Sequence, residues 1–290
     1  MSRAHVVTSS ELYSLRDLEL MTKATVEGLR QGLHRSPFHG YSAEFAQYRH
    51  YRPGDDLKYV DWKAFARTDR IYTRQFRETT NLSALFVVDV SRSMDFHGKF
   101  QLARTVTAIL GTLVLDQGDA AGVLAVDDRA HFVPPRSGHH HLRVFLSEVA
   151  SLRAEGATSI AEALRRAAAI VKRRGLLLVV SDLYEDAAAL AEIKRIARMG
   201  HDVIVIHTLA REELTLEVGG AAEFVDLESG RTLMVQPGAA RESYVAAVHT
   251  WLATTEQQLR REGIAYLRLI ADEPLEPALR RFLVGRRGGS

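Results

Sequence analysis

The sequence predicts an α/β protein whose mostly parallel sheet is covered by helices on both faces. Two observations support this fold class. After residue 81, short continuous apolar runs alternate with segments in which apolar residues recur at helical spacing. The runs, such as residues 83–90 and 176–180, have the length of buried strands. In addition, 290 residues with 46% hydrophobic composition can bury a substantial core.

The expected elements follow in chain order. Residues 10–33 carry an apolar stripe and predict an N-terminal helix, whereas 34–70 are broken by Pro and Gly and predict turns that join short elements. A strand is expected at 71–78, and a hairpin at 222–235. The remaining strands are expected at 84–90, 121–128, 131–134, 176–182, 202–209 and 265–270, and the helices at 99–115, 140–152, 159–173, up to about 199, 239–262 and 274–283.

These elements divide into an N-terminal helix with an irregular extension (1–80), an α/β domain (81–275), and a C-terminal helix and tail (276–290). The 38 Lys and Arg nearly balance the 36 Asp and Glu, so whole-protein charge favours neither nucleic acid nor anionic lipid as a partner. The absence of cysteine excludes disulfides and thiolate chemistry. Since no signal peptide or membrane-length apolar run is recognisable, we expect a cytoplasmic protein without a membrane span.

Oxygen-bearing side chains follow three of the expected elements, at strand ends or at a helix start. Asp89, Ser91 and Ser93 alternate directly after the first strand, Thr158 precedes a helix, and Asp182 ends a later strand. Open α/β folds form their binding crevices at the carboxyl ends of parallel strands. The pattern therefore predicts that these five side chains converge.

Hydroxyl and carboxylate oxygens suit Mg²⁺, which prefers octahedral oxygen coordination, and Mn²⁺ or Ca²⁺ are alternatives. We expect Ser91, Ser93 and Thr158 to bind the ion directly, while Asp89 and Asp182 hold waters or bind the ion themselves. With at most two negative charges from the protein, the ion keeps a position for an acidic group from outside. Thr158 can equally serve as a helix cap, because threonine has that chemistry too.

The predicted extension contains three further acidic residues that could bind a metal ion. Asp55, Asp56 and Asp61 could form another acidic metal site, or they could form buried ion pairs with neighbouring arginines such as Arg52 and Arg67. The Pro-Gly-Asp-Asp turn favours the structural alternative.

Two resemblances rest on these residues. The five predicted ligands are similar to the metal-ion-dependent adhesion site of von Willebrand A-like (Rossmann-like) domains, with Arg92 where many such sites have Gly. Tyr-Arg-Pro-Gly-Asp-Asp at 51–56, Val-Asp-Trp at 60–62 and Ala-Arg-Thr at 66–68 resemble the bacterial family catalogued as domain of unknown function 58, over nearly the whole chain. That resemblance implies a partnership with AAA+ ATPases of the MoxR type.

Three functions remain open from the sequence. The first is a non-catalytic adaptor that docks an acidic residue of a protein partner, a MoxR-type ATPase or its client, on the metal. The second is a metal-dependent phosphohydrolase, although Ser91 stands where such an enzyme needs an acid–base Asp two residues after the nucleophile. The third is a scaffold with a vestigial site. We expect the adaptor, which is not an enzyme.

Overall fold

The chain forms two compact units in the computed structural model, which describes residues 15–32, 43–56, 59–78, 82–127, 130–155, 160–184, 187–216, 222–225, 232–235 and 237–287. Residues 1–37 and 83–290 make up one of them, called here the α/β unit. Residues 38–82 make up the other, called here the hairpin unit.

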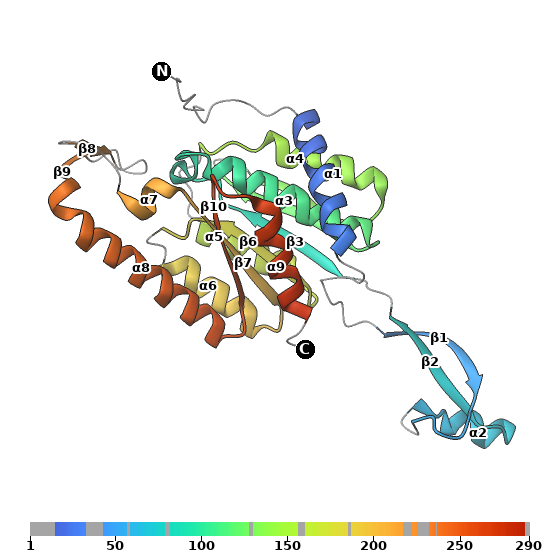
Figure 1. The fold of residues 1–290 in the computed structure, drawn as a ribbon. Coiled ribbons are helices and arrows are strands. Elements are labelled where there is room, and N and C mark those ends of the chain that lie inside the picture. Colours follow the sequence, from blue (N-terminus) through green and yellow to red (C-terminus); the bar gives the residue numbers. More distant parts are fainter. Residues whose placement is uncertain are drawn as a thin grey trace. The chain divides into compact units, whose positions relative to one another are not determined.

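A six-stranded sheet with the order β10-β7-β6-β3-β4-β5 forms the centre of the α/β unit (Figure 1). Neighbouring strands are parallel, except that the edge strand β5 runs antiparallel to β4. The predicted fold class is confirmed. The strands are β3 (Ser83–Val88), β4 (Ala120–Val126), β5 (Ala130–Arg136), β6 (Leu176–Ser181), β7 (Asp202–Leu209) and β10 (Ala265–Ile270).

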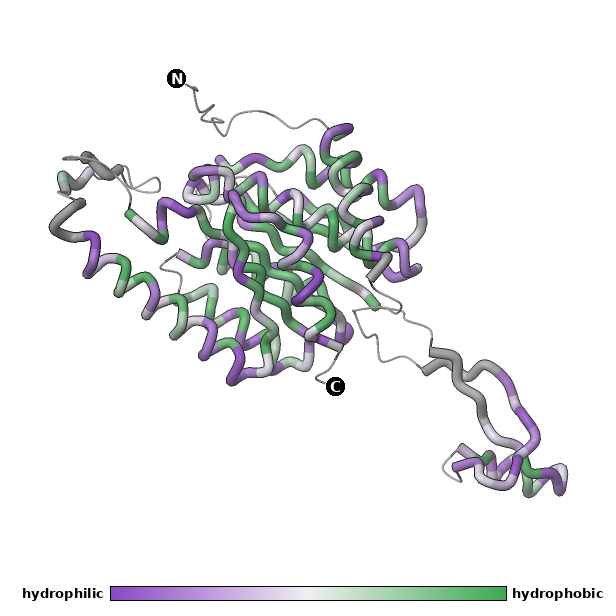
Figure 2. Tube along the Cα trace, in the orientation of Figure 1, coloured by the Kyte–Doolittle hydropathy of each residue, from purple (hydrophilic) through white to green (hydrophobic). Residues whose placement is uncertain are grey.

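Helices cover both faces of this sheet, which explains why its central strands are apolar at successive positions (Figure 2). On one face, Phe86 of β3 packs edge-on against Phe145, with ring centroids 5.5 Å apart. On the other face, Leu85 and Val87 belong to a core cluster with the opposite helices. The first face carries α3 (Lys99–Asp116) and α4 (His139–Ser151), and the second carries α5 (Ile160–Ile170), α6 (Ala187–Arg198) and α8 (Pro237–Arg261).

Short elements complete the unit. A 3₁₀ turn, η2 (Arg92–Asp95), follows β3, and a five-residue helix, α7 (Arg211–Thr215), follows β7. The predicted hairpin is present as β8 (Ala222–Val225) paired antiparallel with β9 (Thr232–Val235). Among the described helices, none combines the length and the apolar character that crossing a bilayer requires.

The terminal helices belong to the α/β unit, which differs from the predicted boundaries at residues 80 and 275. Helix α1 (Leu15–Gly32) packs on α3, α4 and α9 (Leu275–Arg287), with Leu18 and Leu29 buried. Arg280 of α9 donates a hydrogen bond to the Gly28 carbonyl at 2.7 Å. The chain is therefore one α/β unit interrupted by the hairpin unit, because apolar stripes at both chain ends complete the same core.

The hairpin unit consists of β1 (Ala43–His50) paired antiparallel with β2 (Tyr72–Glu78), and of α2 (Trp62–Thr68) between them in the chain. The sequence predicted β2 but placed β1 within a stretch of turns. Asp61 is the N-cap of α2: its Oδ1 accepts hydrogen bonds from the amides of Lys63 and Ala64, each at 3.0 Å, and its Oδ2 accepts one from the Tyr48 hydroxyl at 2.8 Å. Such caps satisfy amides that lack intrahelical partners.

Asp55 holds the turn that precedes α2. Its carboxylate accepts hydrogen bonds from the Arg52 amide at 2.8 Å, from Arg49 Nη2 at 2.7 and 2.9 Å, and from the Thr73 hydroxyl at 3.3 Å. These contacts, first of all the one from the Arg52 amide, lower the pKa of Asp55. Asp55 thus forms an ion pair with an arginine, as the sequence predicted. Its partner, however, is Arg49 and not one of the arginines that the sequence indicated.

We expect Asp61→Ala to destabilise the hairpin unit by about 1–2 kcal/mol, because the cap of α2 is lost. Hydrogen–deuterium exchange should become faster in residues 62–68 and stay unchanged in the strands of the α/β unit. Lys63→Ala, an exposed position on the same helix, is the matched control. Equal exchange in the two variants would contradict the role of the cap.

Candidate metal centre

Two neighbouring parallel strands bring the predicted ligands together. Strands β3 and β6 pair in register with Val88 opposite Val180, and the Asp89 amide continues the ladder by donating to the Val180 carbonyl at 2.9 Å. Asp89 therefore follows β3 beside Ser181 and Asp182, at the carboxyl edge of the sheet. This is the edge at which open α/β folds bind ligands.

Asp89 is buried, with 5% of its surface exposed. Its Oδ2 accepts a hydrogen bond from the Ser181 hydroxyl at 2.6 Å, and its Oδ1 accepts one from the Ser91 amide at 3.0 Å. Burial, and then the negative charge of Asp182, raise the pKa of Asp89 from 3.8 to about 6, against the effect of these hydrogen bonds. Asp89 is thus a buried carboxylate next to a second one, an arrangement that disfavours its ionised form.

The two serines of the Asp-x-Ser-x-Ser pattern face each other. Ser91 precedes η2 and Ser93 lies within it, and their Oγ atoms are 3.0 Å apart. In an octahedron with metal–oxygen distances of about 2.0–2.1 Å, neighbouring ligand oxygens are separated by about 2.8–3.0 Å. The serine pair therefore has the spacing of two adjacent Mg²⁺ ligands.

A buried lysine contacts the second strand-end carboxylate. Lys99, the first residue of α3, is 1% exposed, and its Nζ donates to Asp182 Oδ2 at 2.7 Å and to Glu213 Oε1 at 2.5 Å. Burial lowers the pKa of Lys99, but the charges and hydrogen bonds of Asp182 and Glu213 exceed this effect and raise it overall. Lys99 is therefore a stable cation between two carboxylates.

Lys99 limits what Asp182 can do. The Oδ2 atom of Asp182 is held by the ammonium group, and its Oδ1 accepts a hydrogen bond from the Tyr184 amide at 3.2 Å. Of the two roles expected for Asp182, holding a water fits this geometry better than direct metal binding, since both oxygens already accept a hydrogen bond.

Four of the five predicted ligands are described, and Thr158 lies outside the described residues. Glu155, three residues before Thr158, lies near Asp95 of η2. Burial raises the pKa of Asp95, and the negative charge of Glu155 raises it further. Arg92, the residue that departs from the usual glycine, is exposed.

The charge of the hydrogen-bonded set favours a divalent cation. With their carboxylates ionised, Asp89, Asp182 and Glu213 carry three negative charges, and Lys99 carries one positive charge. The set is thus left with two negative charges, which one Mg²⁺ would neutralise. The donor set, two hydroxyls and carboxylate oxygen, also matches the chemistry of this ion.

His207 of β7 forms a hydrogen bond with the backbone of Asp182. Burial lowers the pKa of His207 to about 4, so the ring is neutral at physiological pH. Its Nε2 lies 2.6 Å from the Asp182 carbonyl oxygen, which can only accept, so Nε2 carries the proton and Nδ1 accepts a hydrogen bond from the Tyr266 hydroxyl at 2.7 Å. This bond fixes the backbone at the end of β6.

The sequence did not reveal Lys99, Glu213 or His207 as parts of the site. Lys99 meets Asp182 across 83 residues and Glu213 across 114. The one available signal was a lysine at the start of a helix whose next turns are apolar, where burial demands a partner for the charge.

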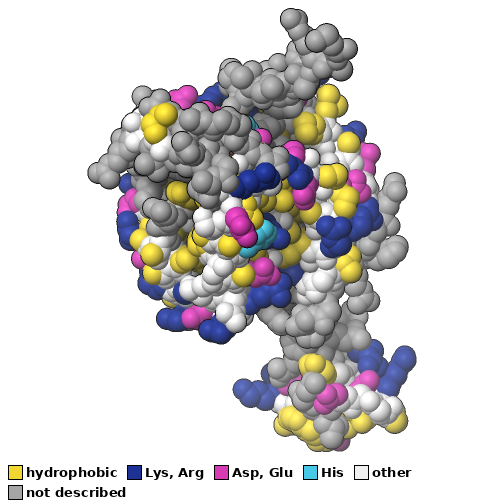
Figure 3. Space-filling view, turned by 60° about the vertical axis from the view of Figure 1, so that its left-hand side comes forward, with side chains coloured by type: hydrophobic (Ala, Val, Ile, Leu, Met, Phe, Trp, Pro, Cys, Tyr) yellow, Lys and Arg dark blue, Asp and Glu magenta, His cyan; other side chains and the backbone are white. Residues whose placement is uncertain are grey.

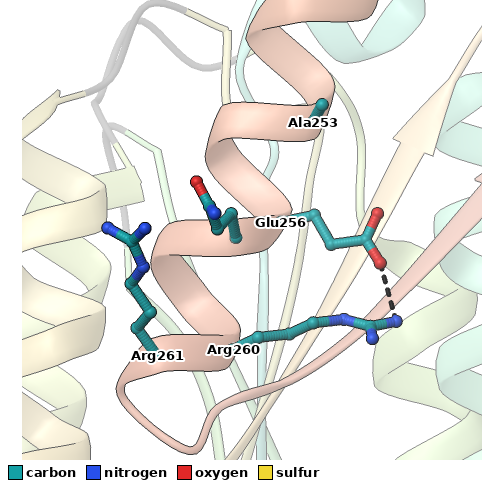
Figure 4. Close-up of a pocket in the computed structure, with 5 residues that line it drawn as sticks. Ala253, Glu256, Arg260 and Arg261 are labelled. Carbon is teal, nitrogen blue, oxygen red and sulfur yellow. Dashed lines mark ion pairs between the residues drawn. The ribbon is translucent and has the colours of Figure 1, made fainter.

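Within the described ranges, no group of three or more His, Asp and Glu side chains could hold a metal ion, at this site or elsewhere. A metal ion at the end of β3 would therefore need the serine hydroxyls as ligands. A shallow groove of about 480 Å³ lies along the end of α8, with Glu256 and Arg260 paired at 2.7 Å (Figure 4). Its lining comes from a single helix: Ala253, Glu256, Gln257, Arg260 and Arg261.

The fold and the site define an α/β protein whose strand-end loops gather hydroxyl and carboxylate oxygens. The family model described as "Protein of unknown function DUF58" matches residues 47–253. The chain belongs to this family, as the motif at 51–68 predicted.

Two bacterial proteins are similar to this chain in sequence. "Uncharacterized protein Rv1480" of Mycobacterium tuberculosis is 30% identical over 291 residues, which cover 96% of this chain and 90% of the relative. YeaD of Bacillus subtilis is 28% identical over 161 residues, 54% of this chain and 39% of YeaD.

Solved structures with a similar fold include BatB from Bacteroides thetaiotaomicron, with a TM-score of 0.47 and 18% identity over 72% of this chain and 100% of BatB. Another is a von Willebrand factor type A protein from Catenulispora acidiphila, with a TM-score of 0.40 and 15% identity over 74% of this chain and 44% of that chain.

Proposed function

We propose that the protein is a non-catalytic binding module that uses a Mg²⁺ ion to dock an acidic residue of a protein partner. The observation that carries the proposal is the serine pair, spaced like two ligands of one ion beside a buried carboxylate set with two uncompensated negative charges. Ser91 and Ser93 would bind the ion, with Asp89 and Asp182 holding its waters or, in the case of Asp89, binding directly. Mn²⁺ and Ca²⁺ are alternative ions.

The carboxylate of the partner would coordinate the metal ion directly. Ser91 and Ser93, the ligands proposed to touch the ion directly, are uncharged, so the ion would stay electrophilic enough for a carboxylate from outside to take a vacant position. The resemblance to proteins that accompany MoxR-type AAA+ ATPases makes such an ATPase, or its client, the partner we propose. Action in the cytoplasm is part of this proposal.

A phosphohydrolase is the weaker alternative. It would need a general acid near the nucleophilic carboxylate, yet Ser91 occupies the position two residues after Asp89. Lys99, the nearest cation to the carboxylates, is buried and engaged by Asp182 and Glu213. Both features favour binding over phosphoryl transfer.

Replacing a proposed ligand tests the metal site. We expect Mg²⁺ to stabilise the wild type against thermal unfolding, by about 2.7 kcal/mol at a concentration of 100 Kd. In Ser91→Ala the Kd for Mg²⁺ should rise at least about 10-fold, because one ligand is lost. Ser151→Ala, an exposed serine at the end of α4, is the matched control. No thermal shift or binding heat with Mg²⁺ or Mn²⁺ in the wild type would favour a scaffold with a vestigial site.

The same variants test docking. The wild type should retain the MoxR-type ATPase of its own cell, or its client, in a crosslinking pull-down with Mg²⁺, and chelator or Ser91→Ala should abolish retention while Ser151→Ala preserves it. Retention that survives both treatments would count against a metal bridge. Hydrolysis of a generic phosphate ester that disappears in Asp89→Asn would favour the enzyme.

A further inference from the structure

We propose that Tyr184 and Trp251 form an apolar wall beside the metal site, and that this wall binds an apolar residue next to the partner's acidic residue. The inference rests on the proposed function and adds the kind of sequence that the site recognises. It concerns a surface of the α/β unit formed by the turn after β6 and by α8.

The turn after β6 ties Tyr184 to the metal site. The Leu183 amide donates to Ser181 Oγ at 2.9 Å, and the Tyr184 amide donates to Asp182 Oδ1 at 3.2 Å. Leu183 is buried and adopts a left-handed conformation with a φ of 50°, which is rare for a branched side chain. Such strain persists where the surroundings enforce it, and here it turns Asp182 inward and places Tyr184 at the surface.

The ring of Tyr184 packs against a chain of two further aromatic rings. Tyr184 and Trp251 meet edge to face, with centroids 6.4 Å apart at 75°. Trp251 in turn meets His207 at 5.3 Å and 88°. Since His207 also donates a hydrogen bond to the Asp182 carbonyl, one residue contacts both the wall and the metal site.

Tyr184 presents much of its surface to solvent. The residue is 64% exposed, among the highest values for large hydrophobic side chains in the described chain. Figure 3, which brings the α7 and α8 side of Figure 1 forward, shows hydrophobic side chains interspersed with charges of both signs. Contact with an apolar side chain would remove ring surface from water, which is favourable at about 25 cal/mol per Å².

The chemistry of the two neighbouring features defines the occupant. A metal ion takes a carboxylate, and an aromatic ring two residues from Asp182 takes an aliphatic or aromatic group. A protein segment in which Asp or Glu adjoins a large apolar residue supplies both. A small carboxylate anion, or an acidic run without apolar residues, supplies one.

Two short peptides test the wall: acetyl-Leu-Asp-Leu-amide and acetyl-Gly-Asp-Gly-amide, titrated into the ¹⁵N-labelled full chain in saturating Mg²⁺ and followed by NMR. We expect the leucine peptide to bind at least about 10-fold more tightly, equivalent to about 1.4 kcal/mol. In Tyr184→Ser this preference should fall below about 2-fold while the Mg²⁺-induced thermal shift stays that of the wild type. Tyr59→Ser, an exposed tyrosine of the hairpin unit, should retain the preference.

The outcomes separate the wall from the metal site. Equal affinity of the two peptides, or binding of neither, overturns the wall even when Mg²⁺ stabilises the protein. A preference for the leucine peptide that depends on Tyr184 and persists in a wild type without any Mg²⁺ response supports the wall and overturns the metal bridge.

Discussion

Replacing Asp89 by Asn should make the metal-free protein more stable at pH 7.5 and abolish its response to Mg²⁺. The pKa of Asp89, about 6 in the folded protein against 3.8 ordinarily, means that the folded state binds the proton more tightly than the unfolded state. Stability of the metal-free protein therefore decreases as the pH rises from about 4 to about 6, and the lower value persists above this range. Asparagine removes that cost.

We expect a gain of about 1–2 kcal/mol in EDTA, less than a two-unit pKa shift implies, because a neutral amide accepts weaker hydrogen bonds than a carboxylate. Urea unfolding in EDTA and in Mg²⁺, at pH 5 and pH 7.5, measures both effects. The wild type should gain more from Mg²⁺ at pH 7.5, where Asp89 is ionised. Asp127→Asn, at the end of the neighbouring strand β4, should keep the wild-type response. A destabilised Asp89→Asn in EDTA would contradict the charge argument.

Lys99→Met should destabilise the protein by about 3–5 kcal/mol, because it leaves Asp182 and Glu213 without the cation that both contact. The urea midpoint in EDTA is the measurement. Methionine keeps most of the volume of the side chain, so the loss reports the ion pairs. Part of the loss should be recovered in Mg²⁺, whose positive charge acts on the same carboxylates.

Glu213→Gln provides the milder comparison. Glu213 is 24% exposed at its side chain, so we expect a loss of about 1 kcal/mol. This variant also keeps the prediction testable if Lys99→Met does not fold. Arg165→Ala breaks an exposed ion pair on α5, in which Arg165 lies 2.9 Å from Glu162. Equal losses of stability in Glu213→Gln and Arg165→Ala would show that the buried ion pairs contribute no more than an exposed one.

The sequence predicted most helices and strands of the α/β unit, because apolar periodicity is set by which residues of a single element are buried. The apolar run 84–90 and the helical stripe 99–115 correspond to β3 and to α3 (Lys99–Asp116), and the predicted hairpin, long helix and last strand are also present. Strand β1 was missed because Pro and Gly dominate its surroundings, and its pairing with β2 depends on residues 22 (His50 with Tyr72) to 35 (Ala43 with Glu78) positions away.

The site was predictable as far as chain order and strand ends allow. Asp89 and Asp182 could be placed at one edge, because parallel strands bring their carboxyl ends together. The ammonium group of Lys99 could not be placed, since its partners lie directly after β6 and on α7, and the sequence does not state which helix start faces which strand end. The contact that most restricts Asp182 was thus outside the reach of spacing alone.

The packing of α1 ties the α/β unit to a helix that lies before the hairpin unit in the chain. The surfaces that bury Leu18 and Leu29 belong to α3, α4 and α9. A fragment that starts at β3 would leave these apolar surfaces exposed to water. Removing everything before residue 83 would therefore delete part of the core of the α/β unit together with the hairpin unit.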